Sequence, residues 1–451
     1  MADAASTIFA LSSGHGRAGV AVIRISGPHA GAALEALAGP RPKPRYAALR
    51  KLHAPGSSQV LDEALVLYFP APRSETGEEM AELHVHGGRA VIEATLAALA
   101  TVPGCRMAEP GEFARRAFEN GKLDLTALEG LADLIDAETE AQRAQAVAQA
   151  GGALASLYEG WRERLIHAQA LVEAGIDFSD EGDISTRTMI EARSEVGLLH
   201  RTIAVHLASA HRGEIIRGGF RVVLAGPPNA GKSSLLNALT RRDAAIVSSE
   251  AGTTRDVIDV HLNLGGVPVI VSDTAGIREA TGAIEQEGIR RTLATAQGAH
   301  LVLWLTEIGA PLAKSPQLTS AQERGPVVVI VRTKSDLAVA RPDVTRNHPP
   351  AEFAVSALTG EGLDRLTEGL ADRARAAIGR HDAPPPTQQR HREHLRHALA
   401  HLEAFMSSDG SEPELRAEDL RQAANALSRI TGRIDAEAVL GAIFGRFCIG
   451  K

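Results

Sequence analysis

A phosphate-binding loop is the clearest chemical feature of this 451-residue sequence. Its residues, GPPNAGKS at 226–233, fit the pattern G-x-x-x-x-G-K-S/T. The backbone N–H groups of such a loop, together with the start of the following helix, surround an anion. Lys232 is expected to reach the β- and γ-phosphates of a nucleotide, and Ser233 to bind Mg²⁺.

Four more motifs follow this loop in chain order: GTTRD at 252–256, DTAG at 273–276, TKSD at 333–336 and SAL at 356–358. The first is a polar loop able to close over a γ-phosphate. The second begins with Asp273, a carboxylate at the end of a strand, where it can hold Mg²⁺ through water. Five motifs in this order indicate a nucleotide switch that binds GTP and Mg²⁺.

The choice of guanine depends on Asp336, because a carboxylate accepts both the N1–H and the 2-amino hydrogen atoms of guanine. Adenine offers no such pair and would leave the carboxylate unsatisfied. The backbone of Ser356–Leu358 is expected at the guanine O6. Two departures matter: Thr333 replaces the usual Asn, which predicts a weaker supporting hydrogen bond, and Ile277 replaces the water-positioning Gln of Ras-like proteins.

These motifs define the expected nucleotide site, in which Lys232 and Thr254 also act in hydrolysis and Ser233, Thr254 and Asp273 bind Mg²⁺. The full set of expected GTP contacts is Asn229, Ala230, Gly231, Lys232, Ser233, Ser234, Ser248, Ser249, Glu250, Ala251, Gly252, Thr253, Thr254, Asp273, Thr274, Ala275, Gly276, Thr333, Lys334, Asp336, Ser356, Ala357 and Leu358.

The elements that position these residues are predicted by the apolar runs FRVVLAG, VPVIVSDTAG, HLVLWLT and PVVVIVRTKSD. Each run enters a polar or glycine-rich turn, which is typical of a buried parallel sheet with helical crossovers. We therefore predict an α/β Ras-like P-loop G domain over 217–380. It is inserted into a discontinuous all-α domain made of 121–216 and 381–451, where Ala, Leu, Glu and Arg dominate at helical spacing.

Residues 1–120 mix strand-like and helical runs and predict a separate α+β domain. The composition, 44% hydrophobic and 23% charged, fits a multidomain globular protein, and the net charge of -7 excludes a bulk polycation that coats nucleic acid. The chain has only two cysteines, and neither a secretion signal nor an apolar run long enough to span a membrane is visible. These features favour a cytoplasmic protein.

The five motifs, the segment GRAGVAVIRISG, the segments ELHVHGG, PGEFARRAF, GKLDL and DFSDE, and the terminal FCIGK together resemble the MnmE (TrmE) family of tRNA-modification GTPases. The resemblance implies a folate-binding, homodimerising N-terminal domain and a heterotetramer with the flavoprotein MnmG (GidA). It also implies installation of an aminomethyl or carboxymethylaminomethyl group at C5 of the wobble uridine (position 34) of certain tRNAs. The one-carbon donor would be 5-formyl- or 5,10-methylene-tetrahydrofolate.

The same resemblance assigns roles to individual residues of this sequence. It implies a K⁺ site between dimerised G domains formed by Asn229, Ser248, Glu250 and Thr253, with Glu285 as the catalytic acidic residue. The implied folate ligands are Arg24, Glu82, Lys122 and the terminal Lys451, and a thiol role is implied for Cys448.

Other interpretations of the sequence stay open at this point. A GTP-dependent ribosome-assembly factor that binds RNA without modification chemistry would share all five motifs, and a GTP-regulated scaffold for the flavoprotein is a second alternative. The histidines at 391, 394, 397 and 401 share one helical face, which we interpret as solvated or facing RNA rather than as a metal site. The basic run at 41–51 is interpreted as a surface loop, although tRNA contact is the alternative.

Overall fold

The computed structural model describes residues 6–14, 16–178, 182–241, 245–246, 258–273, 298–310, 326–340, 353–379, 384–407, 413–434, 437–445, 447 and 450. These residues divide into two compact units. The first contains Met1–Ala132, Gln149–Val196 and Ala400–Lys451, and the second contains Asp133–Ala148 and Gly197–Leu399. The domain boundaries predicted from the sequence stay predictions.

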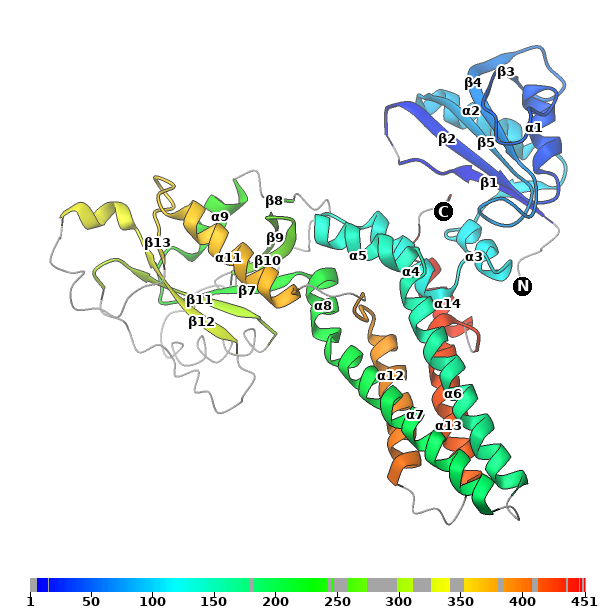
Figure 1. Ribbon diagram of the computed structural model, residues 1–451. Coiled ribbons are helices and arrows are strands. Elements are labelled where there is room, and N and C mark those ends of the chain that lie inside the picture. The colour runs from blue at the N-terminus through cyan, green and yellow to red at the C-terminus, as the bar shows by residue number, and fades with distance from the viewer. Residues whose placement is uncertain are drawn as a thin grey trace. The chain divides into compact units, whose positions relative to one another are not determined.

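The first unit begins with a six-stranded sheet in the order β3-β4-β5-β2-β1-β6 (Figure 1). Its strands are β1 (Thr7–Leu11), β2 (Ala18–Ser26), β3 (Ala48–His53), β4 (Val60–Phe69), β5 (Met80–Gly87) and β6 (Cys105–Met107). Alternate residues of the strands, such as Ile23, Val66 and Leu83, pack with α1 (Ala30–Ala38) and α2 (Arg89–Ala100) to form the core. The opposite face contacts α3 (Glu112–Glu119) through Phe113.

Helices follow the sheet in the chain. They are α4 (Leu125–Ile135), α5 (Glu140–Ala150), α6 (Ala153–Asp177), α7 (Gly182–Ala208), α8 (Ala210–Gly218), α12 (Gln389–Ser407), α13 (Pro413–Thr431) and α14 (Glu437–Phe444). Local sequence sets their starts: the Asp124 carboxylate accepts the N–H of Thr126 at 2.8 Å before α4, and Thr139 and Gln142 form a reciprocal capping box before α5. Within the first unit α6 packs along α13.

The histidine face of α12 differs from the sequence prediction. His391 is fully buried, so the expected solvated or RNA-facing role is wrong for this residue. Burial and the neighbouring His391 lower the pKa of His206, on α7, to about 4. His401 instead pairs with Asp419 of α13 at 3.0 Å. The face therefore serves helix packing along part of its length.

The second unit holds a sheet whose described strands follow the order β13-β12-β11-β7-β10-β9-β8. The strands are β7 (Phe220–Ala225), β8 (Ala245–Ile246), β9 (Ile258–Leu264), β10 (Val267–Asp273), β11 (Leu301–Glu307), β12 (Val327–Thr333) and β13 (Phe353–Ala354). In the sheet, the neighbours β10, β7, β11, β12 and β13 run parallel to one another. At the other edge, β9 pairs antiparallel with β10, and β8 pairs antiparallel with β9. Helices α9 (Lys232–Thr240) and α11 (Leu363–Ile378) pack on one face, and a 3₁₀ helix, η2 (Ser335–Ala340), follows β12.

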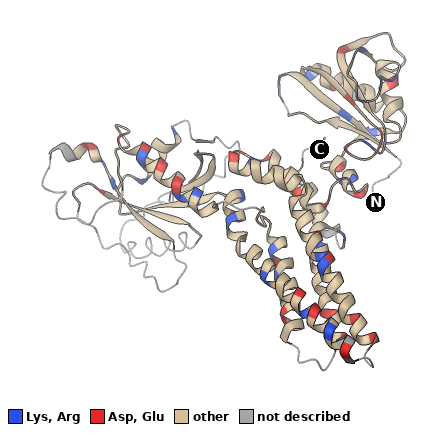
Figure 2. Cartoon of the chain, in the orientation of Figure 1, with Lys and Arg blue, Asp and Glu red and all other residues tan. Residues whose placement is uncertain are grey.

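Each of the longer strands of this sheet carries one charged side chain, whereas α11 carries several (Figure 2). That distribution is expected for strands buried within layers. Two close contacts hold parts of this unit together, the first between α5 and the sheet and the second between α8 and the segment before α12. The Ala141 N–H at the start of α5 donates to Gly266 O at 2.9 Å in the β9–β10 turn. Gly213 of α8 packs so closely on Pro386 that a Cβ there would lie 2.7 Å from the Pro386 carbonyl oxygen.

Candidate functional site

The phosphate loop lies between β7 and α9, at the carboxyl edge of the parallel strands. Gly226 and Gly231 have positive φ angles of 145° and 86°, and a Cβ on Gly226 would lie only 2.3 Å from the Leu305 carbonyl oxygen. Glycine is therefore required for the backbone to turn here. Because β7 sits between β10 and β11 in the sheet, the loop occupies the point where the strand order reverses, which is where open α/β sheets bind ligands.

One hydroxyl group and one carboxylate group lie in contact beside this loop. The Ser233 Oγ donates to Asp273 Oδ2 at 2.7 Å, so the first turn of α9 and the end of β10 present two hard oxygen ligands side by side. This donor set fits Mg²⁺. The Lys232 ammonium lies over the loop and donates to the carbonyl oxygens of Gly226 at 3.0 Å and Pro227 at 3.1 Å.

The segment expected to bind the base is joined directly to the phosphate loop. The Thr333 hydroxyl donates to the Ala230 carbonyl oxygen at 2.8 Å, and both residues are buried. The hydroxyl thus bonds to the phosphate loop, and the weaker support expected from the absence of Asn stays a prediction. The next residue, Lys334, has φ 58° and pairs with Glu307 at 2.9 Å.

Asp336 and Ser356–Leu358 are held close together at the ends of β12 and β13. The Ser335 N–H donates to Val355 O at 3.1 Å, and the buried Ser356 Oγ accepts the Thr359 N–H at 3.2 Å. Asp336 lies half-buried in the first turn of η2, while Leu358 is exposed. This arrangement brings the segment of Asp336 next to the turn that begins at Ser356.

A second group of polar residues lies on the sheet of the first unit. Arg24 on β2 stands opposite Glu82 on β5 and donates to its Oε1 at 3.1 and 3.2 Å. The same guanidinium pairs with Glu75 at 2.7 Å, and His84 Nε2 lies 3.1 Å from Glu82 Oε2. Glu75 and Glu82 also line a cavity of about 360 Å³.

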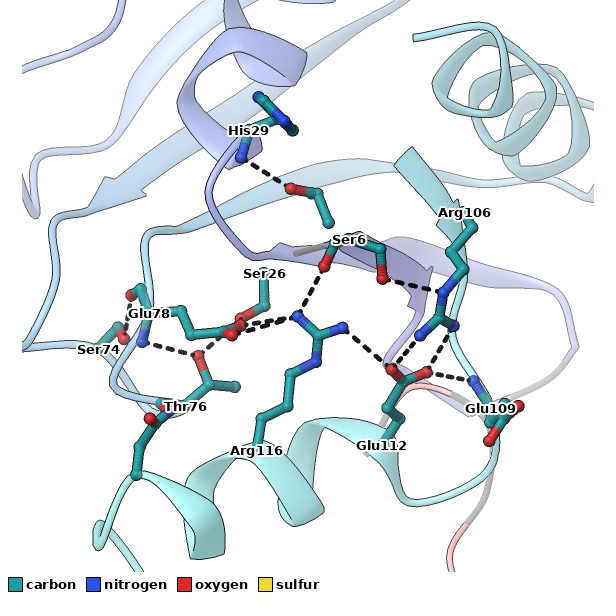
Figure 3. Close-up of polar contacts among 12 residues, drawn as sticks. Ser6, Ser26, His29, Ser74, Thr76, Glu78, Arg106, Glu109, Glu112 and Arg116 are labelled. Carbon is teal, nitrogen blue, oxygen red and sulfur yellow. Dashed lines mark hydrogen bonds and ion pairs between the residues drawn. The ribbon is translucent and has the colours of Figure 1, made fainter. Parts of the chain in front are cut away.

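The loop at 74–79 that carries Glu75 is held by a buried ionic network (Figure 3). Arg116 on α3 bonds to Glu78 at 3.1 Å and to Glu112 at 3.0 Å, and Glu112 also pairs with Arg106 at 2.5 Å. Burial would raise the pKa of Glu112, but hydrogen bonds from Arg106, the Glu109 N–H and Arg116 hold it below its ordinary value. The Glu112 carboxylate is therefore ionised and ties α3 to Arg106 of β6, while Arg116 ties α3 to the loop through Glu78.

Comparison with known proteins shows similarity over nearly the whole chain. The sequence model of the MnmE helical domain matches residues 125–448, and that of the "GTP-binding protein TrmE N-terminus" matches residues 7–122. The tRNA modification GTPase MnmE of Parvibaculum lavamentivorans is 53% identical over 99% of this chain and 100% of its own length, and that of Methylorubrum populi is 50% identical over 99% and 98%.

The chain belongs to the MnmE (TrmE) family. Membership confirms the resemblance seen in the sequence, and the chain is a GTP hydrolase. The broad layout expected for an MnmE protein, with an N-terminal domain, a helical domain and a G domain, is also confirmed. Among solved structures, the G domain of the T. maritima FeoB iron transporter aligns with 34% of this chain and 98% of its own length at 28% identity, but its TM-score of 0.26 carries no weight.

For this MnmE protein, part of the predicted site lies outside the described residues. Those predicted residues are Ser248, Ser249, Glu250, Ala251, Gly252, Thr253, Thr254, Thr274, Ala275, Gly276, Glu285, Cys448 and Lys451. The structure brings together the phosphate loop with Asp273, Thr333 with Ala230, and Arg24 with Glu82. Lys122 lies near the 74–79 loop, where its Cε would be 3.2 Å from a Cβ on Gly77.

Sequence reasoning missed three residues of these two sites in the MnmE chain. Glu307 ends β11 and forms an ion pair with Lys334. The only feature of the sequence that could have indicated this residue was its position at the end of an apolar run. Glu75 pairs with Arg24 from a loop that carries no motif. Arg45 lines the same cavity and belongs to the basic run at 41–51 that we interpreted as a surface loop. Among the described helices, none is both long and apolar enough to cross a bilayer.

Proposed function

We propose that this GTPase acts with the flavoprotein MnmG to install an aminomethyl or carboxymethylaminomethyl group at C5 of the wobble uridine of certain tRNAs. The observation that carries the proposal is the match over both full lengths to relatives named tRNA modification GTPase MnmE. The N-terminal match over residues 7–122 weighs against a ribosome-assembly factor, because an assembly factor needs only the G domain and an RNA-binding surface.

In hydrolysis, the chain binds the phosphates through the N–H groups of the loop and the Lys232 ammonium, which exchanges its bonds to Gly226 and Pro227 for phosphate oxygens. Ser233 and Asp273 would hold Mg²⁺ together with Thr254, and the bound ion would supply positive charge at the phosphate oxygens. Water attacks the γ-phosphorus, the bond to the β-phosphate oxygen breaks, and GDP and inorganic phosphate leave. Glu285 orients that water.

Potassium is the proposed second cation of the G domain. Asn229 supports this role, because it is exposed on the phosphate loop with φ 61° and so presents its side chain away from the fold. The remaining ligands implied by the family resemblance are Ser248, Glu250 and Thr253. When bound, the ion supplies positive charge at the phosphates in the way an arginine finger does.

Folate is the proposed one-carbon donor. The side chains that line the cavity suit a folate chemically, because the Glu82 carboxylate can accept two hydrogen bonds from the edge of a pterin. Arg24 holds Glu82 in place and Lys122 lies near the adjoining loop. The Gly450 carbonyl accepts the Ser12 hydroxyl at 2.7 Å, and this contact beside β1 supports the proposed roles of the neighbouring residues Lys451 and Cys448 in folate chemistry.

A homodimer through the N-terminal domain is proposed as well. Leu49 and Leu65 are paired neighbours on β3 and β4, and their side chains are 59% and 44% exposed on the sheet face opposite α1 and α2. Exposed leucines side by side on a sheet favour a protein contact. With MnmG the dimer would form a heterotetramer.

Nucleoside mass spectrometry of tRNA tests the function. Cells that lack this protein should lose the C5-modified wobble uridine of certain tRNAs, and wild-type protein should restore it, whereas Ser233→Ala should not. A deletion strain with unchanged wobble uridines would contradict the proposal, and so would purified protein that hydrolyses ATP in preference to GTP.

A further inference from the structure

The backbone itself points to a third functional residue. Among the residues that the structure describes, three that are not glycine have φ near +60°: Arg45 at 65°, Asn229 at 61° and Lys334 at 58°. Such backbone is unfavourable for residues with a Cβ and gathers at ligand sites, where the surrounding fold holds it in place. Asn229 and Lys334 belong to the nucleotide site. Arg45 lies in the N-terminal domain, on the wall of the cavity that contains Glu82.

Three contacts fix Arg45 in this conformation. Its N–H donates to Tyr68 O at 2.9 Å. Its guanidinium lies over the Phe69 ring, 5.6 Å from the ring centroid, and donates to the carbonyl oxygen of Arg73. The cation is therefore held at the cavity wall rather than moving freely in solvent.

The cavity has an acidic part and a basic part. Glu75 and Glu82 line it and are both paired with Arg24, whereas Arg45 and Arg73 line it without a carboxylate partner among the described residues. Two arginines that line one cavity without a carboxylate partner among the described residues favour an anion as ligand, and carboxylates and phosphates suit the planar donors of a guanidinium group.

Apolar side chains lie between Glu82 and Arg45 along the sheet. Met80 and Glu82 are two residues apart on β5 and so share a sheet face, with a spacing of about 7 Å along the strand. Met80 is paired with Phe69 of β4, whose ring lies against Arg45. From Glu82 to Arg45 the order of surfaces is thus a carboxylate, the side chains of Met80 and Phe69, and a guanidinium group.

We propose that Arg45 and Arg73 form a subsite for the glutamate carboxylates of the folate donor. This inference rests on the proposed use of folate. The order of surfaces matches the order of groups in the ligand, since a p-aminobenzoyl ring separates the donor edge of a pterin from the glutamate tail. A polyglutamate tail carries more carboxylates than a single glutamate, so the subsite would make the protein prefer polyglutamylated folate.

Calorimetric titration of the full-length chain tests the subsite with three probes: 5-formyltetrahydrofolate as monoglutamate, the same folate as pentaglutamate, and a reduced pterin without a tail. The variants are Arg45→Gly, which suits φ 65°, and Arg73→Gln, which keeps the carbonyl that Arg45 binds. The control is Arg50→Gln, an exposed arginine on β3 that does not line the cavity.

We expect wild-type protein and the Arg50 control to bind pentaglutamate more tightly than monoglutamate. Each cavity variant should weaken pentaglutamate binding about fivefold, and the weakening should shrink in high salt, while binding of the tail-free pterin stays constant. Equal binding of all probes by variants and wild type would overturn the subsite and leave folate use intact. A uniform loss for all three probes would also overturn it, because the arginines would then support only the cavity. If wild-type protein bound no folate, the proposed donor itself would be wrong.

Discussion

The hydroxyl of Thr333 joins the segment expected to bind guanine to the phosphate loop. It replaces the side-chain amide of the usual motif, yet it reaches the Ala230 carbonyl oxygen at 2.8 Å because β12 ends directly beside the loop. From sequence alone the substitution predicted a weaker support, since the distance between two loops far apart in the chain cannot be inferred from either loop. The residue types predicted which groups lie at this site, but they did not predict the hydrogen bond between Thr333 and Ala230.

Removing this hydroxyl should weaken GTP binding. In Thr333→Val the shape is kept, but the buried Ala230 carbonyl loses its donor, which costs about 1–2 kcal/mol and predicts a roughly tenfold higher Kd for GTP. Titration with a fluorescent GTP analogue measures it. Thr333→Ser keeps the hydroxyl and should bind within about twofold of wild type; an equal loss in both variants would mean that the methyl group, not the bond, matters.

Glu285 provides the residue-scale test of hydrolysis. Glu285→Ala should lower kcat about a hundredfold, because a group that orients the attacking water is lost, and should leave the Kd for GTP unchanged. Single-turnover hydrolysis and equilibrium binding separate the two effects. Glu287→Ala, two residues away, is the control. Normal turnover of the Glu285 variant would remove this residue from the catalytic set.

At the scale of elements, the sequence predicted strands and helices well where their patterns were long. The apolar runs of the G domain became β7, β10, β11 and β12, and the texture after Asp124 became long helices. The pairing of Arg24 with Glu82 across β2 and β5 was not predictable from spacing, since register between distant strands depends on tertiary packing. Burial of His391 was missed for the same reason: periodicity identifies a helical face but not what covers it.

The ionic network on α3 should be essential for the stability of the N-terminal domain. Glu112 is 1% exposed and Arg116 is 5% exposed, so Arg116→Met leaves buried carboxylates with one cation fewer. Loss of one partner of a buried pair costs about 3 kcal/mol or more. Urea unfolding measures the change. Arg89→Met breaks only an exposed pair with Glu93 and should cost about 0.5 kcal/mol or less.

The packing of α7 on α12 should be sensitive to acid. Burial and His391 lower the pKa of His206 from 6.5 to about 4. The unfolded chain therefore binds more protons between these values, and the free energy of unfolding should fall as the pH falls from 6.5 to 4, by up to about 1.4 kcal/mol per pH unit. Chemical unfolding across this range checks it. His206→Leu should flatten the slope, whereas the exposed His397→Gln should not; equal slopes in all three proteins would exclude His206 as the cause.

At the scale of the whole molecule, family membership follows from a match over the full length rather than from any one motif. The sequence was sufficient for the three kinds of domain. It was not sufficient to predict the cavity, which is formed by β4, β5, the segment of Arg45 and a loop without a motif.

Exchange of potassium for sodium should affect hydrolysis and assembly together. If a K⁺ ion is held between two G domains, sodium at the same ionic strength should lower the GTPase rate and the dimerisation of the G domains. GTP turnover and spin-label distances between G domains in the full-length dimer measure the two effects. Equal rates and equal distances in both salts would contradict the cation proposal.

The close contact of Gly213 with Pro386 has a consequence for how the chain folds. Residues 214–385 connect α8 to the segment before α12, and the two ends of this connection lie in contact. Closing so long a loop in an unfolded chain is entropically expensive, but a sheet that folds first brings its own ends together and removes most of that cost. During synthesis on the ribosome, folding of this sheet would therefore bring residues 213 and 386 together, and slow folding of the sheet would delay the packing of α8 against the segment before α12.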